Sequence, residues 1–473
     1  MTRRKGEPMP ELTADGIAAR TPDSDPDAPI YLDASRTAEE RALDLLARMS
    51  LAEKIAQLGS AWAFELSDGH EFDPARARER MSDGLGQVTR VAGATNLPPA
   101  QVVRLGNAVQ RFLIEETRLG IPAILHEESL HGVMARDATC FPQAIGVAAT
   151  WDPSLGERMA QRIGHHLRAT GASQALAPVL DITRDPRWGR LEETYGEDPY
   201  LAAEMGCASV RGLQETPRGE RPVIATGKHM VGHGLPEGGL NQAPAHIGTR
   251  ELMDAFLFPF EAAVRDARIG SMMHAYDDVD GLPCAASREL LTHVLRERWG
   301  FDGIVVADYM GIEQLLSLHQ LVDDLGAAAA MTLEAGLDVE LPATAAYGEP
   351  LRRAVEDGSV DVALVDTAVE RVLRTKFRLG LFEQPYADED IDIGTRDTDM
   401  AVALEVARRS MVLLENDGTL PLRDDLRSLA VTFSVFPSKL TVIASIVFRI
   451  RSMARFASIV LVAGRTTANS SPP

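Results

Sequence analysis

The sequence contains few cysteines, no long apolar run and no excess of basic residues. Its three cysteines, Cys140, Cys207 and Cys284, are widely spaced and odd in number, which excludes a disulfide framework and a zinc cluster and predicts small buried side chains. With 48 Lys and Arg against 69 Asp and Glu, the formal charge is −21. This charge argues against nucleic acid and anionic membranes as partners and suits a neutral substrate.

No stretch has the pattern of a leader or a membrane span. The first residues, MTRRKGEPMPELTADG, include basic side chains but no apolar segment follows them, so no secretory signal is expected and a cytoplasmic location is the default. Near the other end, Arg449, Arg451 and Arg455 interrupt an apolar stretch well before the roughly 20 residues that a membrane helix needs. We therefore expect no membrane anchor.

The order of apolar and polar segments predicts the fold class. The 473 residues suit two or three domains, or one barrel with an appendage. A short apolar strand, a polar tip and a helix recur, which predicts an α/β protein with a mostly parallel sheet. A TIM-type (β/α)8 barrel is favoured over an open sheet because polar tips follow strands along the whole series, with no single glycine-marked switch point. The predicted strands are 121–125, 175–179, 223–226, 271–276, 304–307 and 337–341.

The stretch GFDGIVVADYMGI, residues 300–312, carries the strongest single candidate. Residues 304–307 are continuously apolar, as in buried parallel strands, and the strand ends on Asp308. Helices are predicted before it over 287–299 and after it over 311–333. In a barrel the carboxyl ends of the strands carry the chemistry, which would place Asp308 on the active face. The alternative is that Asp308 only caps the following helix.

Further strand tips carry the side chains that bind a neutral polyol. Carboxylates accept hydrogen bonds from sugar hydroxyls, and Lys, Arg and His donate to their oxygens. Aromatic side chains supply apolar walls, for which Trp151, Trp188 and Tyr195 are candidates. The polar candidates are Glu128 and His131 in HEESLHG, Arg187 and Arg190 in RDPRWGRLEETYGEDPY, Lys228 and His229 in GKHMVGHG, and Tyr276 in MMHAYDDVDG.

Several of these candidates also have other interpretations. Arg187 and Arg190 could pair structurally with acidic residues of their own loop, an interpretation favoured for Arg187 but not for Arg190. Lys228 could be a Schiff-base lysine of the aldolase type. His229 and His233 have a spacing that suits a metal pair, but the adjacent glycines disfavour a helix there, and no metal is expected.

Four strings occur together in a defined order: RDPRWGRLEETYGEDPYL, KHMVGHG followed by EGGLNQAPAHIGTREL, MMHAYDDVDGLPC, and GFDGIVVADYMGI. Together they resemble the amino-terminal barrel of glycoside hydrolase family 3, the β-glucosidase and β-xylosidase group, over roughly residues 40–425. The resemblance implies an exo-acting enzyme that cleaves terminal β-linked glucose or xylose with retention of configuration and without a cofactor. A small oligosaccharide or an aryl β-glycoside is the implied ligand.

The resemblance also implies a role for each matching residue. Asp308 is implied to be the catalytic nucleophile that forms a covalent glycosyl-enzyme. The cationic neighbours are expected to favour its ionised form, and Tyr276 to hydrogen-bond to it. The implied contacts of the sugar in the first subsite are Glu128, Arg190, Lys228, His229, Met273 and Tyr276.

Two features depart from the family pattern. Many glucosidases of the family have Asp where this chain has Glu128, and the longer side chain would intrude where a hexose carries its C6 hydroxymethyl group. This favours a pentose, although one methylene changes selectivity by only about 1–3 kcal/mol. In two-domain members the acid/base is a Glu of the second domain, and a single-domain branch uses a His in a loop that holds His233 and Glu237 here without matching its pattern. The sequence therefore identifies no acid/base.

Composition divides the chain into segments. Residues 1–36 are predicted to be a mobile arm, after which Thr37 and Glu40 form a capping box. Leu426–Pro473 contains no Asp or Glu, so we expect a truncated or frameshifted second domain and impaired turnover, with an inactive sugar-binding remnant as the alternative. The expected segments are a barrel over 37–381, a linker over 382–399, the beginning of an α/β sandwich domain over 400–431 and an atypical tail over 432–473.

Overall fold

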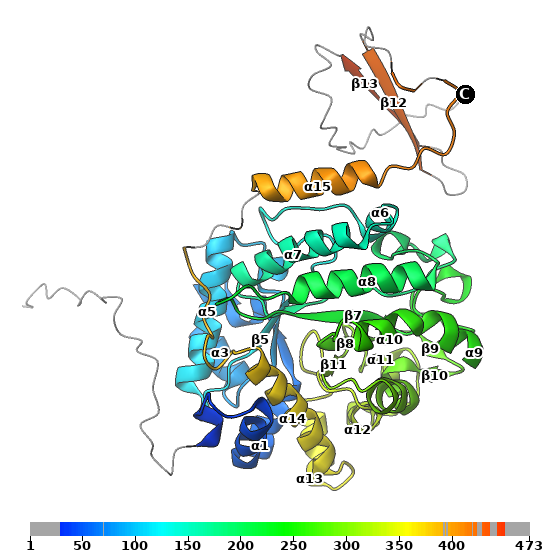
Figure 1. Ribbon diagram of the computed structural model, residues 1–473. Helices are drawn as coiled ribbons and strands as arrows, with labels where there is room; N and C mark the ends of the chain where they lie inside the picture. Colours follow the sequence, from blue (N-terminus) through cyan, green and yellow to red (C-terminus); the bar gives the residue numbers. More distant parts are fainter. Residues whose placement is uncertain are drawn as a thin grey trace, which may run out of the picture.

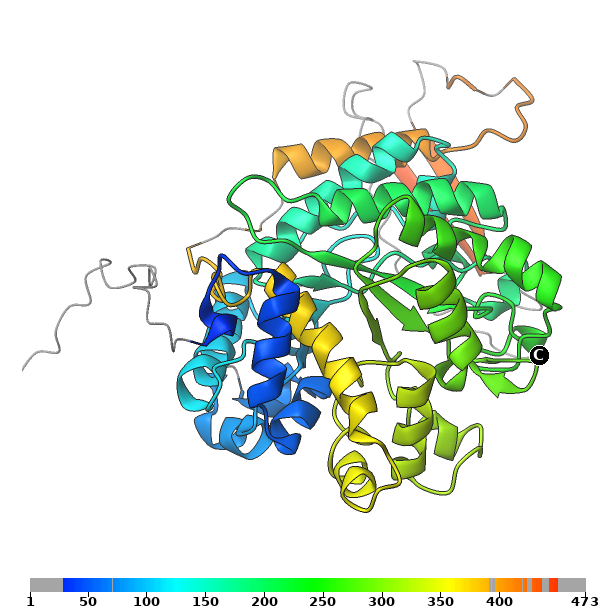
Figure 2. The same cartoon turned by 60° about the horizontal axis from the view of Figure 1, so that its bottom comes forward.

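The computed structural model describes residues 29–69, 71–390, 393, 396–418, 420–422, 428–435 and 442–449. Within these residues a parallel sheet curls into a barrel with helices around it (Figure 1, Figure 2). The seven strands of the sheet in the described part of the chain are hydrogen-bonded in sequence order: β1 (Ser60–Trp62), β4 (Gln87–Thr89), β5 (Ile124–Glu127), β6 (Gln174–Ala175), β7 (Ile224–Met230), β8 (Ser271–His274) and β11 (Ile304–Val306).

An eighth extended segment, residues 337–341, closes the barrel between β11 and β1. Val306 and Val339 form a parallel bridge on the β11 side. On the other side the Glu340 amide donates to the Leu58 carbonyl oxygen (2.9 Å), next to the start of β1. Eight parallel positions with helices outside them confirm the predicted (β/α)8-type barrel.

The strands β1 and β4 are the two barrel positions that the sequence patterns missed. Each has only three residues, which is too short for a periodic apolar signal. In β4 two of the three side chains, Gln87 and Thr89, are polar and fully buried inside the barrel. Gln87 Oε1 lies 2.8 Å from His126 Nδ1 of β5, and the Thr89 hydroxyl donates to the Pro342 carbonyl oxygen, so both polar side chains are paired with groups of other segments.

Helices cover the outside of the sheet, and the main apolar core lies between the two layers. The helices before and between the first strands are α1 (Ala38–Arg48), α2 (Leu51–Leu58), α3 (Pro74–Met81), α4 (Val91–Thr95) and α5 (Pro99–Glu116). Those that follow are α6 (Ala144–Ala148), α7 (Pro153–Ala169), α8 (Pro199–Gln214), α9 (Thr249–Glu251), α10 (Phe258–Arg265), α11 (Gln314–Ser317), α12 (Leu325–Ala335), α13 (Glu349–Glu356), α14 (Val362–Arg378) and α15 (Asp397–Arg409).

Around β11 the predicted helices differ in detail from the observed ones. The helix expected over 287–299 is a π-type helix, η8 (Glu289–Arg298). The single helix expected over 311–333 is wrong in its extent, because residues 318–324 separate α11 from α12. Asp324 ends that interruption by accepting a hydrogen bond from the Ala327 amide and so capping α12.

Shorter elements connect the layers. Two small antiparallel hairpins are formed by β2 (Ser67–Asp68) with β3 (Glu71–Phe72) and by β9 (Asp278–Val279) with β10 (Leu282–Pro283). The other short helical turns are η1 (Ile30–Leu32), η2 (Ala63–Leu66), η3 (Pro186–Trp188), η4 (Leu191–Glu193), η5 (Glu237–Gly239), η6 (Leu252–Phe256) and η7 (Cys284–Ala286).

The amino-terminal boundary is close to the predicted one. Thr37 and Glu40 form the expected capping box at the start of α1. Residues 1–28 of the expected arm lie outside the described residues, but Tyr31 is buried and its carbonyl accepts a hydrogen bond of 2.9 Å from Arg41 Nε. The last part of the expected arm therefore packs against the barrel.

The helix α15 lies along α7 at the side of the barrel (Figure 1). Asp399 of α15 is fully buried and its carboxylate contacts Arg162 and His166 (3.1 Å) of α7. Beyond it, β12 (Ser428–Val435) and β13 (Val442–Arg449) form an antiparallel pair. The expected sandwich domain and tail stay predictions, since much of them falls on residues outside the described ranges.

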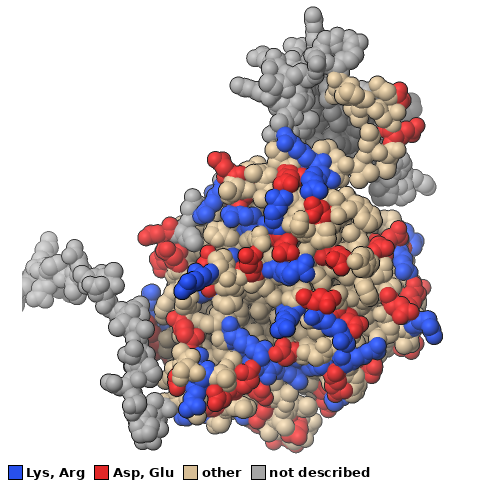
Figure 3. Space-filling view, viewed as in Figure 1, with Lys and Arg blue, Asp and Glu red and all other residues tan. Residues whose placement is uncertain are grey.

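Basic and acidic side chains are interspersed on the face seen in Figure 3. Among the described residues, no helix combines the length and apolarity that crossing a bilayer requires.

Candidate active site

The carboxylate of Asp308 lies at the carboxyl end of β11, two residues beyond Val306, and is 8% exposed. One oxygen, Oδ1, accepts a hydrogen bond of 2.7 Å from the Tyr309 amide. The other, Oδ2, lacks a hydrogen-bond partner among the described residues and lies 3.6 Å from His229 Nε2. The following helix begins only at Gln314, so the interpretation of Asp308 as a helix cap is wrong.

The charge state of Asp308 is set mainly by burial. Burial raises the pKa of Asp308, and the nearby Lys228 ammonium offsets only part of this shift. Lys228 therefore favours the ionised form of Asp308, as expected, but burial outweighs its effect. The Tyr276 hydroxyl donates to the Tyr309 carbonyl oxygen at 2.9 Å. Hydrogen bonding between Tyr276 and Asp308, the contact expected from the resemblance, also lowers the pKa of Asp308, by less than Lys228 does.

Lys228 and Glu128 form an ion pair across the mouth of the barrel. Lys228 comes from β7, Glu128 directly follows β5, and Nζ lies 2.8 Å from Oε2. The lysine side chain is 4% exposed and the glutamate 24%. An ammonium group paired with a carboxylate is not a nucleophile, so this geometry does not support a Schiff-base lysine.

The adjacent Glu127 has a different role. Its carboxylate accepts from the amides of Ala92 and Gly93, at 2.6 and 3.2 Å, at the amino end of α4. Alternate side chains of a strand point to opposite sides, so the first glutamate of the pair fixes a helix and the second, Glu128, faces the site.

Arg190 lies at the centre of a network of buried polar groups. Its Nη1 donates to His233 Nε2 (2.9 Å) and its Nη2 to His229 Nε2 (3.3 Å). Its Nε and Nη2 also donate to the two oxygens of Glu193, at 2.9 and 2.8 Å. The ion pair within the loop that was not favoured for Arg190 is therefore present, but the same guanidinium also lies against the histidines of the site.

Each of the two histidines is held by a buried aspartate. His229 Nδ1 lies 2.8 Å from Asp181 Oδ2, and His233 Nδ1 lies 3.3 Å from Asp277 Oδ1. A guanidinium can only donate, so both Nε2 atoms accept, which assigns the proton of each neutral ring to Nδ1. Burial lowers the pKa of both histidines. Both rings are therefore neutral, with Arg190 as the adjacent cation.

This arrangement does not support a metal pair at His229 and His233. Both Nε2 atoms face a guanidinium, and a cationic donor disfavours a cation at the same position. Within the part of the chain that the structure describes, no group of three or more His, Cys, Asp or Glu side chains is placed to hold a metal ion.

Asp181 and Asp277 are the buried carboxylates that the sequence patterns did not single out. Burial raises the pKa of Asp181 to about 7 and that of Asp277 well above its ordinary value. Asp181 follows the strand β6, and Asp277 follows Tyr276 in a motif that was already a candidate. Their position after strands was the available signal, but only the structure shows that they orient histidines.

The other predicted site residues lie in different surroundings. Met273 of β8 is fully buried and in register with Val306 of β11. Arg187 pairs with Asp185 at 2.6 Å and is 69% exposed, which confirms its structural interpretation with a different acidic partner. Neither residue is part of the network around Arg190.

One of the three candidate aromatic walls lies at the site. The ring of Trp188 meets the His233 ring edge to face, with centroids 5.1 Å apart. Trp151 is 74% exposed and Tyr195 belongs to the apolar core, so these two assignments are wrong.

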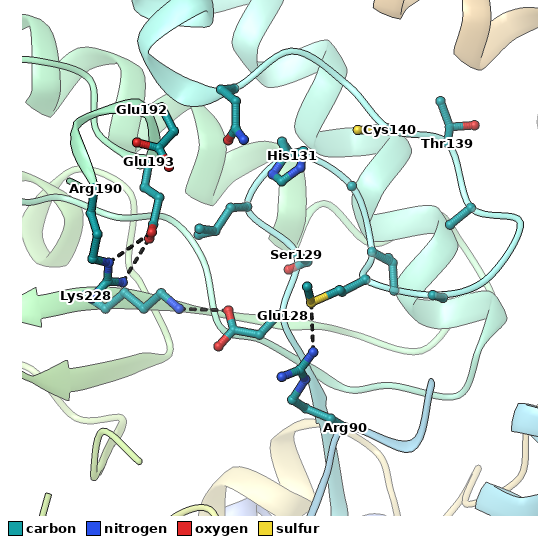
Figure 4. Close-up of a pocket in the computed structure, with 17 residues that line it drawn as sticks. Arg90, Glu128, Ser129, His131, Thr139, Cys140, Arg190, Glu192, Glu193 and Lys228 are labelled. Carbon is teal, nitrogen blue, oxygen red and sulfur yellow. Dashed lines mark hydrogen bonds and ion pairs between the residues drawn. The ribbon is translucent and has the colours of Figure 1, made fainter. Parts of the chain in front are cut away.

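A cavity of about 560 Å³ adjoins the Glu128–Lys228 pair (Figure 4). The loop 129–143 forms most of its wall, and Arg190 contributes to the wall on the side of the network. Asp308 does not line it. Cys140 lies in this wall and is exposed, so the prediction of three buried cysteines holds only for Cys207 and Cys284.

The two residues of the loop considered for an acid/base are placed unfavourably for that task. His233 is fully buried and accepts a hydrogen bond from Arg190, so its Nε2 carries no proton to give. Glu237 is 67% exposed and lies 3.4 Å from His246. The structure therefore does not change the conclusion that the sequence identifies no acid/base.

Comparison with known proteins places this geometry in a family. The model described as glycosyl hydrolase family 3 N terminal domain matches residues 50–375. The chain belongs to glycoside hydrolase family 3. A β-xylosidase from Formosa agariphila is 36% identical to this family 3 chain over 334 residues, which cover 66% of the chain and 46% of the relative.

Other relatives agree in fold and in extent. A periplasmic β-glucosidase from Salmonella typhimurium is 31% identical over 393 residues, covering 80% of this chain and 48% of the relative. The solved structure of a β-glucosidase from Erythrobacter marinus matches with a TM-score of 0.79 and 35% identity, covering 84% of this chain and 53% of that one. This family 3 chain thus spans about half the length of the relatives that it matches.

Proposed function

We propose that this barrel binds terminal β-linked xylose or glucose and forms a covalent glycosyl-enzyme on Asp308, as an exo-acting retaining β-glycosidase. The observation that carries the proposal is the state of Asp308 Oδ2. Among the described residues no group makes a hydrogen bond of ordinary geometry to this oxygen, while the other oxygen of the carboxylate is fixed by a backbone amide. A carboxylate that acts as a nucleophile needs a fixed orientation and a free lone pair on the attacking oxygen, and Asp308 has both.

The proposed reaction has two steps. Asp308 Oδ2 attacks the anomeric carbon, the glycosidic C–O bond breaks, and the leaving oxygen takes a proton from an acid. Water then hydrolyses the ester to Asp308 and restores the configuration. Because no acid was identified beside Asp308 among the described residues, we infer that ordinary sugar leaving groups are cleaved slowly unless residues outside them supply it. General acid catalysis contributes about 10²–10⁴ in rate.

The surrounding side chains suit the sugar in the proposed complex. Glu128 accepts from hydroxyls, while Lys228 and Arg190 donate to sugar oxygens. The names of the relatives, β-xylosidase and β-glucosidase, support these two sugars. The length of Glu128 favours the pentose, because a hexose carries one more hydroxymethyl group at that end.

Covalent trapping tests the proposal directly. An activated 2-fluoro xyloside or glucoside has a leaving group that needs no acid, so it should add one sugar mass to a peptide that contains Asp308. Asp308→Asn should abolish the label, since an amide does not attack the anomeric carbon, and Asp278→Asn should retain it as the matched control. A label on Asp278 or on another carboxylate would show that the nucleophile is wrongly assigned.

The second candidate function is sugar binding without turnover, which the lack of an acid beside Asp308 among the described residues favours. Calorimetry with xylose and glucose, run beside hydrolysis of an aryl glycoside, separates the two: binding without hydrolysis or trapping selects the second. The expected cytoplasmic location also stays a prediction, for which cell fractionation is the test.

A further inference from the structure

The imidazole ring of His274 lies directly against the backbone of Asp308. His274 is the last residue of β8 and is 1% exposed. Its Nδ1 lies 2.7 Å from the Ala275 carbonyl oxygen, and the Asp308 amide donates to its Nε2 at 3.3 Å. A carbonyl oxygen can only accept, so Nδ1 carries the ring proton and Nε2 offers a lone pair. The ring therefore has the tautomer that the Asp308 amide requires.

The charge state of the ring agrees with this tautomer. Burial lowers the pKa of His274 to about 4, and the neighbouring His319 and His233 act in the same direction. The imidazole is therefore neutral near pH 7. With that pKa the ring does not exchange a proton in the neutral range, and it acts as a fixed hydrogen-bond acceptor.

The hydrogen bond to His274 continues the bonding between β8 and β11 as far as Asp308. In a parallel pair the amides of alternate residues of one strand face the other strand. In β11 this series begins with the Ile304 amide, which donates to the Gly270 carbonyl oxygen at 3.3 Å. Four residues later the amide in the same series is that of Asp308, and its acceptor is the His274 ring. A side chain thus supplies the acceptor where the strand passes into the turn that carries the proposed nucleophile.

The turn after Asp308 is shaped around the same ring. The Gly311 amide donates to the Asp308 carbonyl oxygen at 2.8 Å, which closes the turn over residues 308–311. A Cβ atom at Gly311 would lie 2.5 Å from His274 Cε1 and 2.7 Å from His274 Nε2, far inside the ordinary contact distance of carbon atoms. Gly311 therefore leaves the space that the imidazole occupies, and a larger residue would separate the ring from the Asp308 amide.

We propose that His274 is a positioning residue: by accepting from the Asp308 amide, with Gly311 leaving room for its ring, it fixes the backbone that aims the Asp308 carboxylate at the anomeric carbon. The proposal rests on the proposed function, because it concerns the orientation of the nucleophile in that reaction. The carboxylate is tied to the same turn, since its Oδ1 accepts from the Tyr309 amide at 2.7 Å. A shift of the turn therefore moves the attacking Oδ2, and a misplacement of about 1 Å costs up to about 10²-fold in rate.

Two variants of nearly equal shape separate the acceptor from the volume of the ring. In His274→Gln the amide oxygen takes the place of Nε2 as acceptor, whereas in His274→Met a methyl group stands there. In trapping with the 2-fluoro sugar, His274→Met should lower the maximal rate about 10–100-fold at an unchanged half-saturating concentration, and His274→Gln should come within about threefold of the parent chain. Thermal unfolding of both variants verifies that they fold. An equal loss in the two variants would refute the role of the acceptor.

Gly311→Ala tests the same contact and leaves His274 in place. The added methyl group should separate the ring from the Asp308 amide and lower the maximal trapping rate about tenfold. Gly248→Ala is the matched control, because a Cβ there meets nothing within 4 Å and its φ is −69°. The methyl group at 311 would also lie 3.0 Å from the Asp308 carbonyl oxygen, so the substitution is repeated in His274→Met, whose flexible side chain gives way. An equal loss in both backgrounds would assign the effect to the carbonyl and overturn the pairing of Gly311 with the ring.

Hydrogen exchange of the Asp308 amide provides a measurement that does not depend on turnover. Exchange should be faster in His274→Met than in the parent chain and in His274→Gln, because a hydrogen bond protects an amide. If the parent and His274→Met are labelled on Asp308 equally fast, the positioning role is refuted and the nucleophile stands. If the parent is not labelled on Asp308, the proposed function fails. Faster exchange in His274→Met then still supports the contact between ring and backbone, and unchanged exchange refutes that contact as well.

Discussion

The two sides of the Glu128–Lys228 ion pair are built differently. On the Asp308 side, Arg190 donates to two imidazoles whose other nitrogens are held by buried carboxylates. On the cavity side, the loop 129–143 forms most of the wall of an open space of about 560 Å³. The first side is therefore oriented before any ligand arrives, as transition-state stabilisation requires, whereas the second side mainly provides space.

Replacing Arg190 should have the largest effect on the oriented side. Arg190→Met removes the shared donor of His229, His233 and Glu193 and should slow trapping by the 2-fluoro sugar about 10²–10³-fold, the usual loss for one preorganised donor. Arg187→Met is the matched control, because that arginine is exposed and pairs only with Asp185 in the same loop. A loss of similar size in both variants would indicate damage to the loop and not to the network.

Lys228 lies between the two sides, and replacing it should shift the pH dependence of the trapping rate. Burial raises the pKa of Asp308 and Lys228 partly offsets this, so Lys228→Met raises that pKa further. Asp308 must be ionised to attack, so the acidic limb of the pH profile of trapping should move to higher pH. At pH values on that limb the trapping rate should fall about tenfold. Lys54→Met, which breaks an ion pair with Asp366 away from the site, should leave the profile in place. An unshifted limb in Lys228→Met would mean that the lysine does not influence Asp308.

Shortening Glu128, which lies between the two sides, tests whether its length sets the preference between xylose and glucose. Glu128→Asp removes one methylene and should move the ratio of kcat/KM for aryl xyloside over aryl glucoside towards the glucoside by about tenfold. If the acid step limits turnover, trapping rates with the two 2-fluoro sugars give the same ratio. The matched control is Glu192→Asp, another glutamate of the cavity wall that makes no ion pair with Lys228. An unchanged ratio in the first variant would refute the steric explanation.

The smallest effect is expected from replacing Asp277, the aspartate that holds His233. In Asp277→Asn the amide can donate to Nδ1, which favours the tautomer with its proton on Nε2, opposed to the donating Arg190. The maximal trapping rate should fall about two- to tenfold while the affinity for the 2-fluoro sugar is unchanged. Asp278→Asn, one residue further along, should leave both quantities as they are. A fall in affinity alone would show that Asp277 acts on binding and not on the orientation of the network.

Pairs of similar residues show where sequence patterns stop being informative. Glu127 and Glu128 are adjacent, but one fixes the amino end of α4 and the other faces Lys228. Adjacent side chains at the end of one strand point to opposite sides, and which side faces the site depends on how that strand is placed in the barrel. Arg187 and Arg190 lie in one motif, but Arg187 pairs within its own loop, whereas Arg190 contacts His229 and His233. These histidines come from another segment, and no local pattern predicts a contact between segments.

The sequence by itself determined the alternation of strands and helices, the place of Asp308 at a strand end and the family, because each follows from local periodicity or from short strings. Only the tertiary structure decided that burial outweighs Lys228 in setting the pKa of Asp308. It also decided that Asp181 and Asp277 orient the two histidines and that a cavity adjoins Glu128. The physical reason is that desolvation and hydrogen-bond partnership depend on which segments meet, and the groups of this site come from different strands that only barrel closure brings together.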